Sequence, residues 1–450
     1  MRLYVCVKGF GKIREAKIDI SNFTVFVGNN NSGKTYMMQL IYGVLNRLHH
    51  LREFHVNFLG NFDREVRLTK DMYFDLVSDI NDYLTIYKES IVKEIFQKDI
   101  KIEQLRIEIE PDSDQITVDF EDESTVALSD EKNKDHVKWI KLYRRKDDRM
   151  VKQQNIGVFF SKDESSGVIY NVLLCFIFGI TPPDGNVIYM PASRTGILLL
   201  YKYFFSERDR NNQMVFQQNK GNGILSVEKE NDMGLTRPVY DFLQFLLRYV
   251  EENEIEENEC LIRFIQKNLI DGRIENRMGN FVYKPDQAEE FMPLYLASSI
   301  VNELTPILMV LSNRTKYSYI LYDEIETCLH PFKQKEMARL LNRMCNSGFK
   351  MIVSTHSDTM AAKLNNLFLL SFMEDKEKQS EKMKKLGLEE KDLLKEQNVR
   401  VYQFVNDASG KSNVEELKFR TTPYVGYDFS LFTENSMELY NEAEVILEDK

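Results

Sequence analysis

Eight residues near the start of the chain constrain its fold more than any other feature. They match the phosphate-binding loop pattern G-x-x-x-x-G-K-[ST] at every fixed position, and they are Gly28, Asn29, Asn30, Asn31, Ser32, Gly33, Lys34 and Thr35. The apolar, β-branched run 23–27 predicts a buried strand before the loop, and apolar residues at helical spacing across 35–51 predict a helix after it. A strand, a glycine loop and a helix N-terminus in this order bind phosphate, because free N–H groups and the helix dipole both favour an anion.

Two side chains of the loop carry specific roles in that geometry. Lys34 would reach the β- and γ-phosphates of a nucleoside triphosphate, and the Thr35 hydroxyl would bind Mg²⁺. The alternative is a chance match on an ordinary glycine turn, and the correct strand and helix patterns on both sides argue against it. The sequence therefore predicts an α/β fold with a nucleotide site at this loop.

The C-terminal third supplies polar residues at the ends of two further apolar strands. The run 319–322 ends in Asp323 and Glu324, and the run 349–355 ends in His356. Ligands collect at the carboxyl ends of the strands in an α/β sheet. We therefore expect Asp323 to hold Mg²⁺, Glu324 to polarise the attacking water and His356 to sense the γ-phosphate through a ring N–H.

Ser298 and Ser299 stand at a predicted helix start, and Arg194 stands just after the predicted strand 187–190. A serine at a helix N-cap needs no functional explanation, yet serines beside free N–H groups also form a second phosphate cradle. Arg194 faces the nucleotide, faces a subunit interface or forms an ion pair that fixes its turn. The sequence leaves these alternatives open.

Charge and composition limit the partners. The net charge of −11 excludes a protein that binds nucleic acid through its overall charge, so any such contact needs a local patch. One candidate is the stretch 132–152, with nine Lys or Arg, three Asp, Trp139 and Tyr143; the alternative is a solvated surface. Five dispersed cysteines, no signal-peptide pattern and no apolar run long enough to span a bilayer predict a cytoplasmic protein without membrane contact.

The pattern along the chain predicts a nucleotide domain interrupted by insertions. Residues 1–51 and 186–375 would form the domain, and 52–185 would be an inserted helical and β region. A helical insert is expected within 206–290. The last part, 376–450, is expected to be a charged helix and a C-terminal tail.

The order of these motifs resembles that of ABC-type ATPases of the SMC/RecF/OLD group, in which two head domains sandwich the nucleotide. The resemblance rests on five segments. They are a Walker A loop at 28–35, a signature segment at 297–300, a Walker B strand at 321–324, the E-x-x-L-H-P extension of OLD-like members at 326–331 and a switch-histidine segment at 355–358. The signature usually ends in glycine. Ile300 departs from that pattern, which puts tight closure and the rate of hydrolysis in question.

The resemblance implies a P-loop ABC-type ATPase head, with a mixed sheet flanked by helices and an inserted α+β region. It implies ATP and Mg²⁺ as cofactors and a homo-oligomer of head-to-head dimers or higher order. In that assembly Ser298 and Ser299 of one subunit close on the γ-phosphate held by Lys34 of another.

Three absences in the sequence narrow the subgroup. No sustained heptad pattern supports a long coiled coil, the segment after His356 leaves no room for a Toprim nuclease domain, and the six histidines form no H-N-H constellation. The chain therefore resembles the stand-alone ATPase subunits of Septu-like and PARIS-like phage-defence systems. That resemblance implies a sensor-scaffold that controls a separate nuclease effector, with DNA or a phage protein as the trigger.

Two other functions compete with this hypothesis. One is a RecF-like DNA-repair ATPase that acts directly on DNA through the stretch 132–152. The other is a scaffold that holds ATP without hydrolysing it, for which Ile300 is the sequence evidence. A small nuclease gene beside this one would favour defence over repair.

Overall fold

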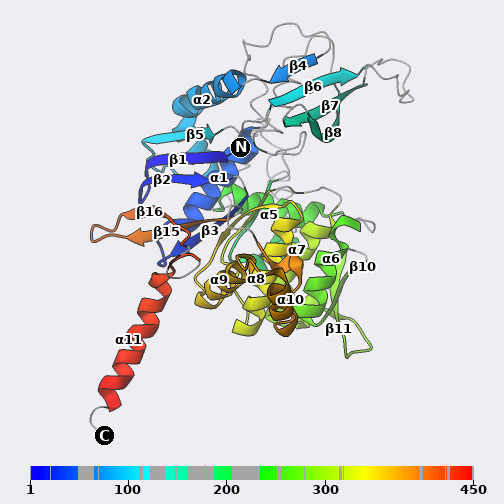
Figure 1. Cartoon of the computed structure of the whole chain (residues 1–450), viewed down its shortest axis with the longest axis vertical. Coiled ribbons are helices and arrows are strands. Elements are labelled where there is room, and N and C mark those ends of the chain that lie inside the picture. The colour runs from blue at the N-terminus through cyan, green and yellow to red at the C-terminus, as the bar shows by residue number, and fades with distance from the viewer. Residues whose placement is uncertain are drawn as a thin grey trace, which may run out of the picture.

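A computed structural model gives the fold of the chain (Figure 1). It describes residues 2–20, 22–48, 65–68, 70–110, 115–121, 137–146, 149–159, 178, 187–204, 234–250, 256–277, 279–313, 317, 319–394, 399–420, 422 and 426–447. Within this part of the chain, no helix has the length and apolar character that crossing a membrane requires.

A nine-stranded mixed sheet forms the centre of the molecule. Its order is β5-β1-β2-β16-β15-β3-β14-β13-β9. In the same order the strands span Gln104–Glu110, Arg2–Phe10, Ile13–Asp19, Ser412–Leu417, Val399–Asn406, Phe23–Gly28, Lys350–Ser354, Tyr319–Tyr322 and Val187–Met190. The predicted α/β class with a mixed sheet flanked by helices is confirmed.

The run of strands from β15 to β9 is parallel, and this part of the sheet carries the predicted motifs. Phe26 of β3 pairs with Ser354 of β14, and Val353 of β14 pairs with Tyr322 of β13. Parallel strands end at one edge, so the phosphate loop, the carboxylates after β13 and the segment after β14 lie next to one another.

Helices cover both faces of the sheet. On one side lie α1 and α2, which span Lys34–Leu48 and Lys70–Phe96. The other side carries α5, α6, α7, α8 and α9, which span Arg237–Arg248, Glu256–Ile265, Ser299–Ser312, Pro331–Asn346 and Asp358–Ser371. Near these lies α10 (Lys376–Lys385), whereas α11 (Ser430–Leu447) extends away from the body (Figure 1).

Two smaller sheets complete the structure. One has the order β4-β6-β7-β8, with strands Glu65–Leu68, Gln115–Glu121, Val137–Lys146 and Arg149–Phe159. The other is the ribbon β10-β11-β12, with strands Gly272–Arg277, Asn280–Pro285 and Met292–Pro293. Short π- and 3₁₀-turns are η3, η4 and η5, which span Gln266–Ile270, Leu294–Leu296 and Glu390–Asp392.

Alternation along the central strands explains why both faces are covered. On β13, Tyr319 and Leu321 belong to the core under α1 and α2, and Ile320 and Tyr322 belong to the opposite core. Neighbouring side chains of a strand point to opposite faces, so an all-apolar strand buries both of them. With both faces covered, the carboxyl ends of the strands are where a ligand can reach the loop.

The central sheet draws on more of the chain than the predicted nucleotide domain. From the predicted insertion, β5 pairs with β1, and from the predicted tail, β15 pairs with β3. The boundaries at 51, 185 and 375 stay predictions. Of the basic stretch 132–152, residues 137–146 lie on β7 and 149–152 on β8. Residues 132–136 and 147–148, and the side chains of the others, lie outside the description.

Candidate nucleotide site

The loop between β3 and α1 has the backbone that its two fixed glycines allow. Gly28 has φ +141° and Gly33 has φ +99°, values that side-chain-bearing residues rarely adopt. A Cβ atom on Gly28 would lie 2.1 Å from the carbonyl oxygen of Phe404 in β15. Glycine is therefore required at position 28 both by its backbone angle and by the neighbouring strand.

The C-terminal strands also support the loop directly. Ser412 at the start of β16 donates its hydroxyl to the carbonyl oxygen of Ser32 at 2.6 Å, and Ser32 donates its own to that of Asn29 at 2.7 Å. From the β1–β2 turn, Lys12 donates to the carbonyl oxygen of Asn31 at 3.1 Å. Two other parts of the sequence, β16 and the β1–β2 turn, thus hold the loop in shape.

Lys34 begins α1 and points into the loop. Its Nζ donates to the carbonyl oxygens of Asn29 at 2.7 Å and Gly28 at 3.0 Å, and the residue is 5% exposed. Burial lowers the pKa of Lys34 to about 8, and the charges of Asp323, Glu324 and Glu326 oppose that shift. The ammonium group is therefore held among the loop carbonyls, close to three carboxylates.

This pKa predicts how ATP affinity depends on pH. Bound phosphate favours the ammonium form of Lys34. Above pH 8 the amine of Lys34 in the free protein is mostly neutral, so ATP binding must be accompanied by the uptake of one proton. Affinity should fall roughly tenfold between pH 7 and pH 9, because one protonation step is linked to binding. Calorimetry at pH 8.5 in two buffers of different ionisation enthalpy should show proton uptake. A flat affinity across this range without proton uptake would contradict the assignment.

Three hydroxyl groups surround the carboxylate of Asp323. Its Oδ2 accepts from Thr35 Oγ1 at 2.8 Å and from the Tyr189 hydroxyl at 3.0 Å, and its Oδ1 accepts from the Ser354 hydroxyl. Asp323 is 1% exposed, and Thr35 stands 288 positions away in the sequence. Carboxylate and hydroxyl oxygens are the hard ligands that Mg²⁺ prefers, so this donor set fits the ion.

Glu324 follows Asp323 in a strained backbone conformation. Its φ is +47°, which is uncommon for a residue other than glycine and costs on the order of 1 kcal/mol. The Ser354 hydroxyl accepts its N–H at 2.8 Å, and a guanidinium N–H of Arg194 donates to its carbonyl oxygen at 2.9 Å. Its side chain is only half-buried. The main chain of Glu324 is thus fixed while its carboxylate stays accessible.

His356 lies next to this group, after β14. Burial lowers the pKa of His356, and the charge of Lys34 adds to the effect against the opposing carboxylates. Its backbone N–H donates to Glu326 Oε1 at 2.5 Å. The imidazole is therefore neutral at pH 7, with one ring N–H available as a donor.

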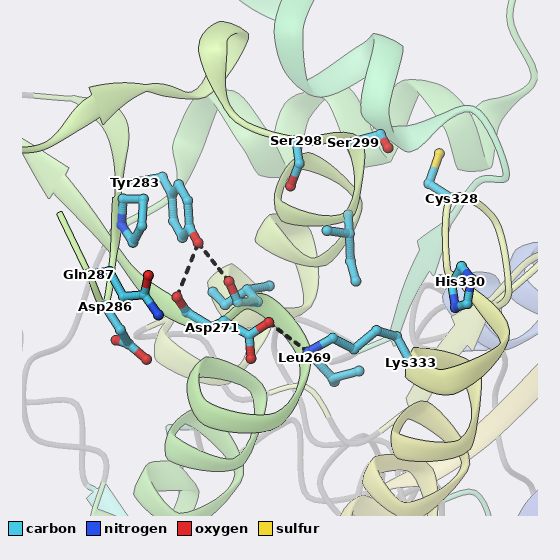
Figure 2. A pocket seen from close by; sticks show the side chains of 13 residues that line it. Leu269, Asp271, Tyr283, Asp286, Gln287, Ser298, Ser299, Cys328, His330 and Lys333 are labelled. Carbon is cyan, nitrogen blue, oxygen red and sulfur yellow. Dashed lines mark hydrogen bonds and ion pairs between the residues drawn. The ribbon is translucent and has the colours of Figure 1, made fainter.

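The two serines lie at a different place, in a hollow of about 750 Å³ (Figure 2). Ser298 is the N-cap residue of α7, but its side chain makes no capping hydrogen bond, and both serines are exposed. Among the described residues, the 13 that line the hollow include Ile300 and His330 but none of the phosphate loop. The structure thus brings Lys34, Thr35, Asp323, Glu324 and His356 together. Ser298 and Ser299 line a hollow to which none of these five residues contributes.

Several residues of the site are missing from the sequence-based prediction. They are Tyr189, Ser354, Ser412, Glu326 and the Arg194 contacts to Asp323 and Glu324. Ser354 had a signal, because it is the last polar residue of the strand before His356. Tyr189 and Ser412 had none, since each reaches the site through the order of strands in the sheet.

Comparison with known families matches residues 3–172 and 250–361, well over half of the chain, to the AAA ATPase domain. No curated protein matches the chain. Similar solved structures include an Smc head bound to the C-winged helix domain of ScpA, at 14% identity, TM-score 0.37 and coverage of 93% of this chain and 97% of that one. Another is the SMC head domain from Thermotoga maritima, at 12% identity, TM-score 0.35 and coverage of 93% and 100%.

Proposed function

The chain belongs to the AAA ATPase domain family, and we propose that it works as an ABC-type head. Two copies would bind ATP between them, with the loop of one copy facing Ser298 and Ser299 of the other. The observation that carries this proposal is that the two serines line a hollow to which no residue of the loop contributes. The exposed Ser298 hydroxyl at the N-terminus of α7 makes no capping hydrogen bond, which suits a phosphate brought by a second copy.

The residues around the loop have distinct roles in this proposal. Lys34 and the loop N–H groups bind the β- and γ-phosphates, and the oxygens of Thr35 and Asp323 hold Mg²⁺. When bound, Mg²⁺ neutralises charge that develops on the phosphates. Glu324 takes the proton of the attacking water, and the neutral ring of His356 donates a hydrogen bond to the γ-phosphate.

We also propose what the ATP-dependent association controls. Closing and opening of the paired heads would hold and release a separate effector, in the manner of the phage-defence ATPases that the motifs resemble. Such a switch needs a ligand that binds one state better than the other, and ATP held between two copies meets that need. The projecting α11 offers a contact surface, since Met437, Tyr440, Val445 and Ile446 are at least 64% exposed.

ATP-dependent association tests the proposed function. Light scattering on the purified protein should show a dimer or larger assembly with ATP and Mg²⁺, and a smaller species without nucleotide. Ser299→Arg should prevent the association while leaving ATP binding intact, because the added bulk faces the partner and not the loop. Ser380→Arg, at an exposed serine of α10, is the matched control and should associate normally. Association of Ser299→Arg that equals the wild type would contradict the proposal.

Each of the two competing functions has one observation in its favour. Ile300 lines the hollow and also packs against the core, so its side chain occupies space where the family pattern has glycine; that favours a scaffold that holds ATP. Seven of the nine Lys and Arg residues of the stretch 132–152 stand on β7 and β8. A concentration of positive charge on neighbouring strands favours a polyanion as partner. DNA-stimulated, salt-sensitive turnover lost on reversal of Arg144 and Arg145 would support DNA as the target.

A further inference from the structure

Arg194 is the largest fully buried side chain in the described part of the chain, with 0% exposure. It begins a helical segment, 194–204, directly after the turn that follows β9. Its guanidinium stacks on the Tyr322 ring at 4.3 Å from the ring centroid. Burying a charge costs free energy unless it is paired and hydrogen-bonded, so the partners of this group indicate what it does.

One set of partners is the backbone of the Walker B turn. Arg194 Nη1 donates to the carbonyl oxygen of Asp323 at 2.6 Å, and Nη2 donates to that of Glu324 at 2.9 Å. The first of these atoms also donates to the carbonyl oxygen of Pro191 at 2.8 Å. Because Glu324 has a positive φ, this planar fork holds the general base in an orientation that its backbone does not favour by itself.

The other partner lies on α7, which begins at the predicted signature segment and is called the signature helix below. Arg194 Nη2 forms an ion pair with Glu303 Oε1, both side chains being 0% exposed, and Thr195 Oγ1 donates to Glu303 Oε2 at 2.6 Å. Glu303 lies on α7 about one turn after Ser299, on a helix of 14 residues. A single guanidinium therefore joins the backbone that carries Glu324 to the helix that begins at the two serines.

Stability alone accounts poorly for this arrangement. A buried ion pair contributes little net stability compared with apolar residues of similar size, because desolvation offsets most of its attraction. What the guanidinium supplies beyond packing is a fixed geometry between α7 and the turn after β13.

We infer that Arg194 is a positioning residue that couples the signature helix to Glu324. This inference rests on the proposed sandwich of two heads. When Ser298 and Ser299 contact a partner's nucleotide, α7 shifts. Glu303 and Arg194 transmit that shift to the backbone of Glu324 and align its carboxylate. ATP binding by Lys34 and Thr35 does not pass through this link, so the link acts on turnover and not on affinity.

The test replaces the ion pair by apolar residues, Arg194→Met with Glu303→Met, which avoids leaving one buried charge unpaired. Arg194→Lys keeps the charge but lacks the planar fork, and it serves as a second variant. The matched control is Arg343→Met. Arg343 is a buried arginine of α8 that forms an ion pair with Asp392 of η5, and neither residue belongs to the loop or the serine segment. Thermal unfolding, ATP affinity and kcat are measured for each.

The double variant should fold, bind ATP within about threefold of the wild type and lose kcat on the order of 100-fold, the effect of a misplacement of about 1 Å. Arg194→Lys should lose kcat with unchanged ATP affinity, and Arg343→Met should keep it. A kcat of the double variant within about threefold of the wild type would overturn the inference.

If the wild type turns over no ATP, the hydrolysis in the proposed function fails, and a second measurement decides the inference. With ATP present throughout, raising the protein concentration from below to above association should slow hydrogen exchange of the amides 323–327 in the wild type and in Arg343→Met, but not in the double variant. Equal protection in the double variant, or none in the wild type, would overturn the coupling.

Discussion

Glu324→Gln is expected to lower kcat for ATP hydrolysis by about 100- to 10,000-fold, the usual contribution of a general base. The amide keeps the shape of the carboxylate, and the strained backbone at this position is held by Ser354 and Arg194, so ATP affinity should stay the same or increase. Single-turnover hydrolysis and equilibrium binding of a fluorescent ATP analogue measure the two quantities. The variant should also accumulate as an ATP-bound assembly.

The neighbouring carboxylate of Glu326 provides the comparison for this variant. Glu326 accepts the backbone N–H of His356, and its charge also acts on Lys34. Glu326→Gln should retain most of the turnover, because an amide oxygen still accepts that N–H. If Glu326→Gln abolished hydrolysis while Glu324→Gln did not, the general base would be Glu326 and the assignment of Glu324 would be wrong.

Lys34→Ala is expected to raise the Kd for ATP roughly 100-fold or more, because it removes a buried charge-assisted contact to the phosphates. The free protein should unfold at the same temperature or a higher one, since burial disfavours the charged form of this lysine. Isothermal calorimetry and thermal unfolding check the two effects. A Kd within about threefold of the wild type would show that phosphate does not bind at Lys34.

The part of the site that the sequence could predict is the part encoded locally. Each of these parts follows an apolar strand: the loop and its helix follow one, Asp323 a second and His356 a third. A short window of sequence therefore contains the pattern that predicts each of them. The helix start at Ser298 and Ser299 is likewise local, although the structure shows that Ser298 makes no side-chain cap.

What the sequence could not predict depends on contacts between distant segments. The predicted tail contributes β15 and β16, which insert between β2 and β3, and nothing in their short alternating patterns specifies that position. The three alternatives for Arg194 could not be separated from its turn alone. Besides the nearby Pro191 carbonyl, its partners are the carbonyl groups of Asp323 and Glu324 and the carboxylate of Glu303, all more than 100 positions away, so an ion pair was correct but incomplete.

The central claim is that each ATP site is completed by a second copy, and mixing two inactive variants tests it most directly. Lys34→Ala lacks the loop contact and Ser299→Arg lacks the serine contact, so each alone should be inactive. A mixed dimer holds one intact site, made of Lys34 from the Ser299→Arg copy and Ser299 from the Lys34→Ala copy, so each mixed dimer should turn over ATP about half as fast as a wild-type dimer. Two inactive variants that stay inactive when mixed, with mixed dimers detected, would contradict the account.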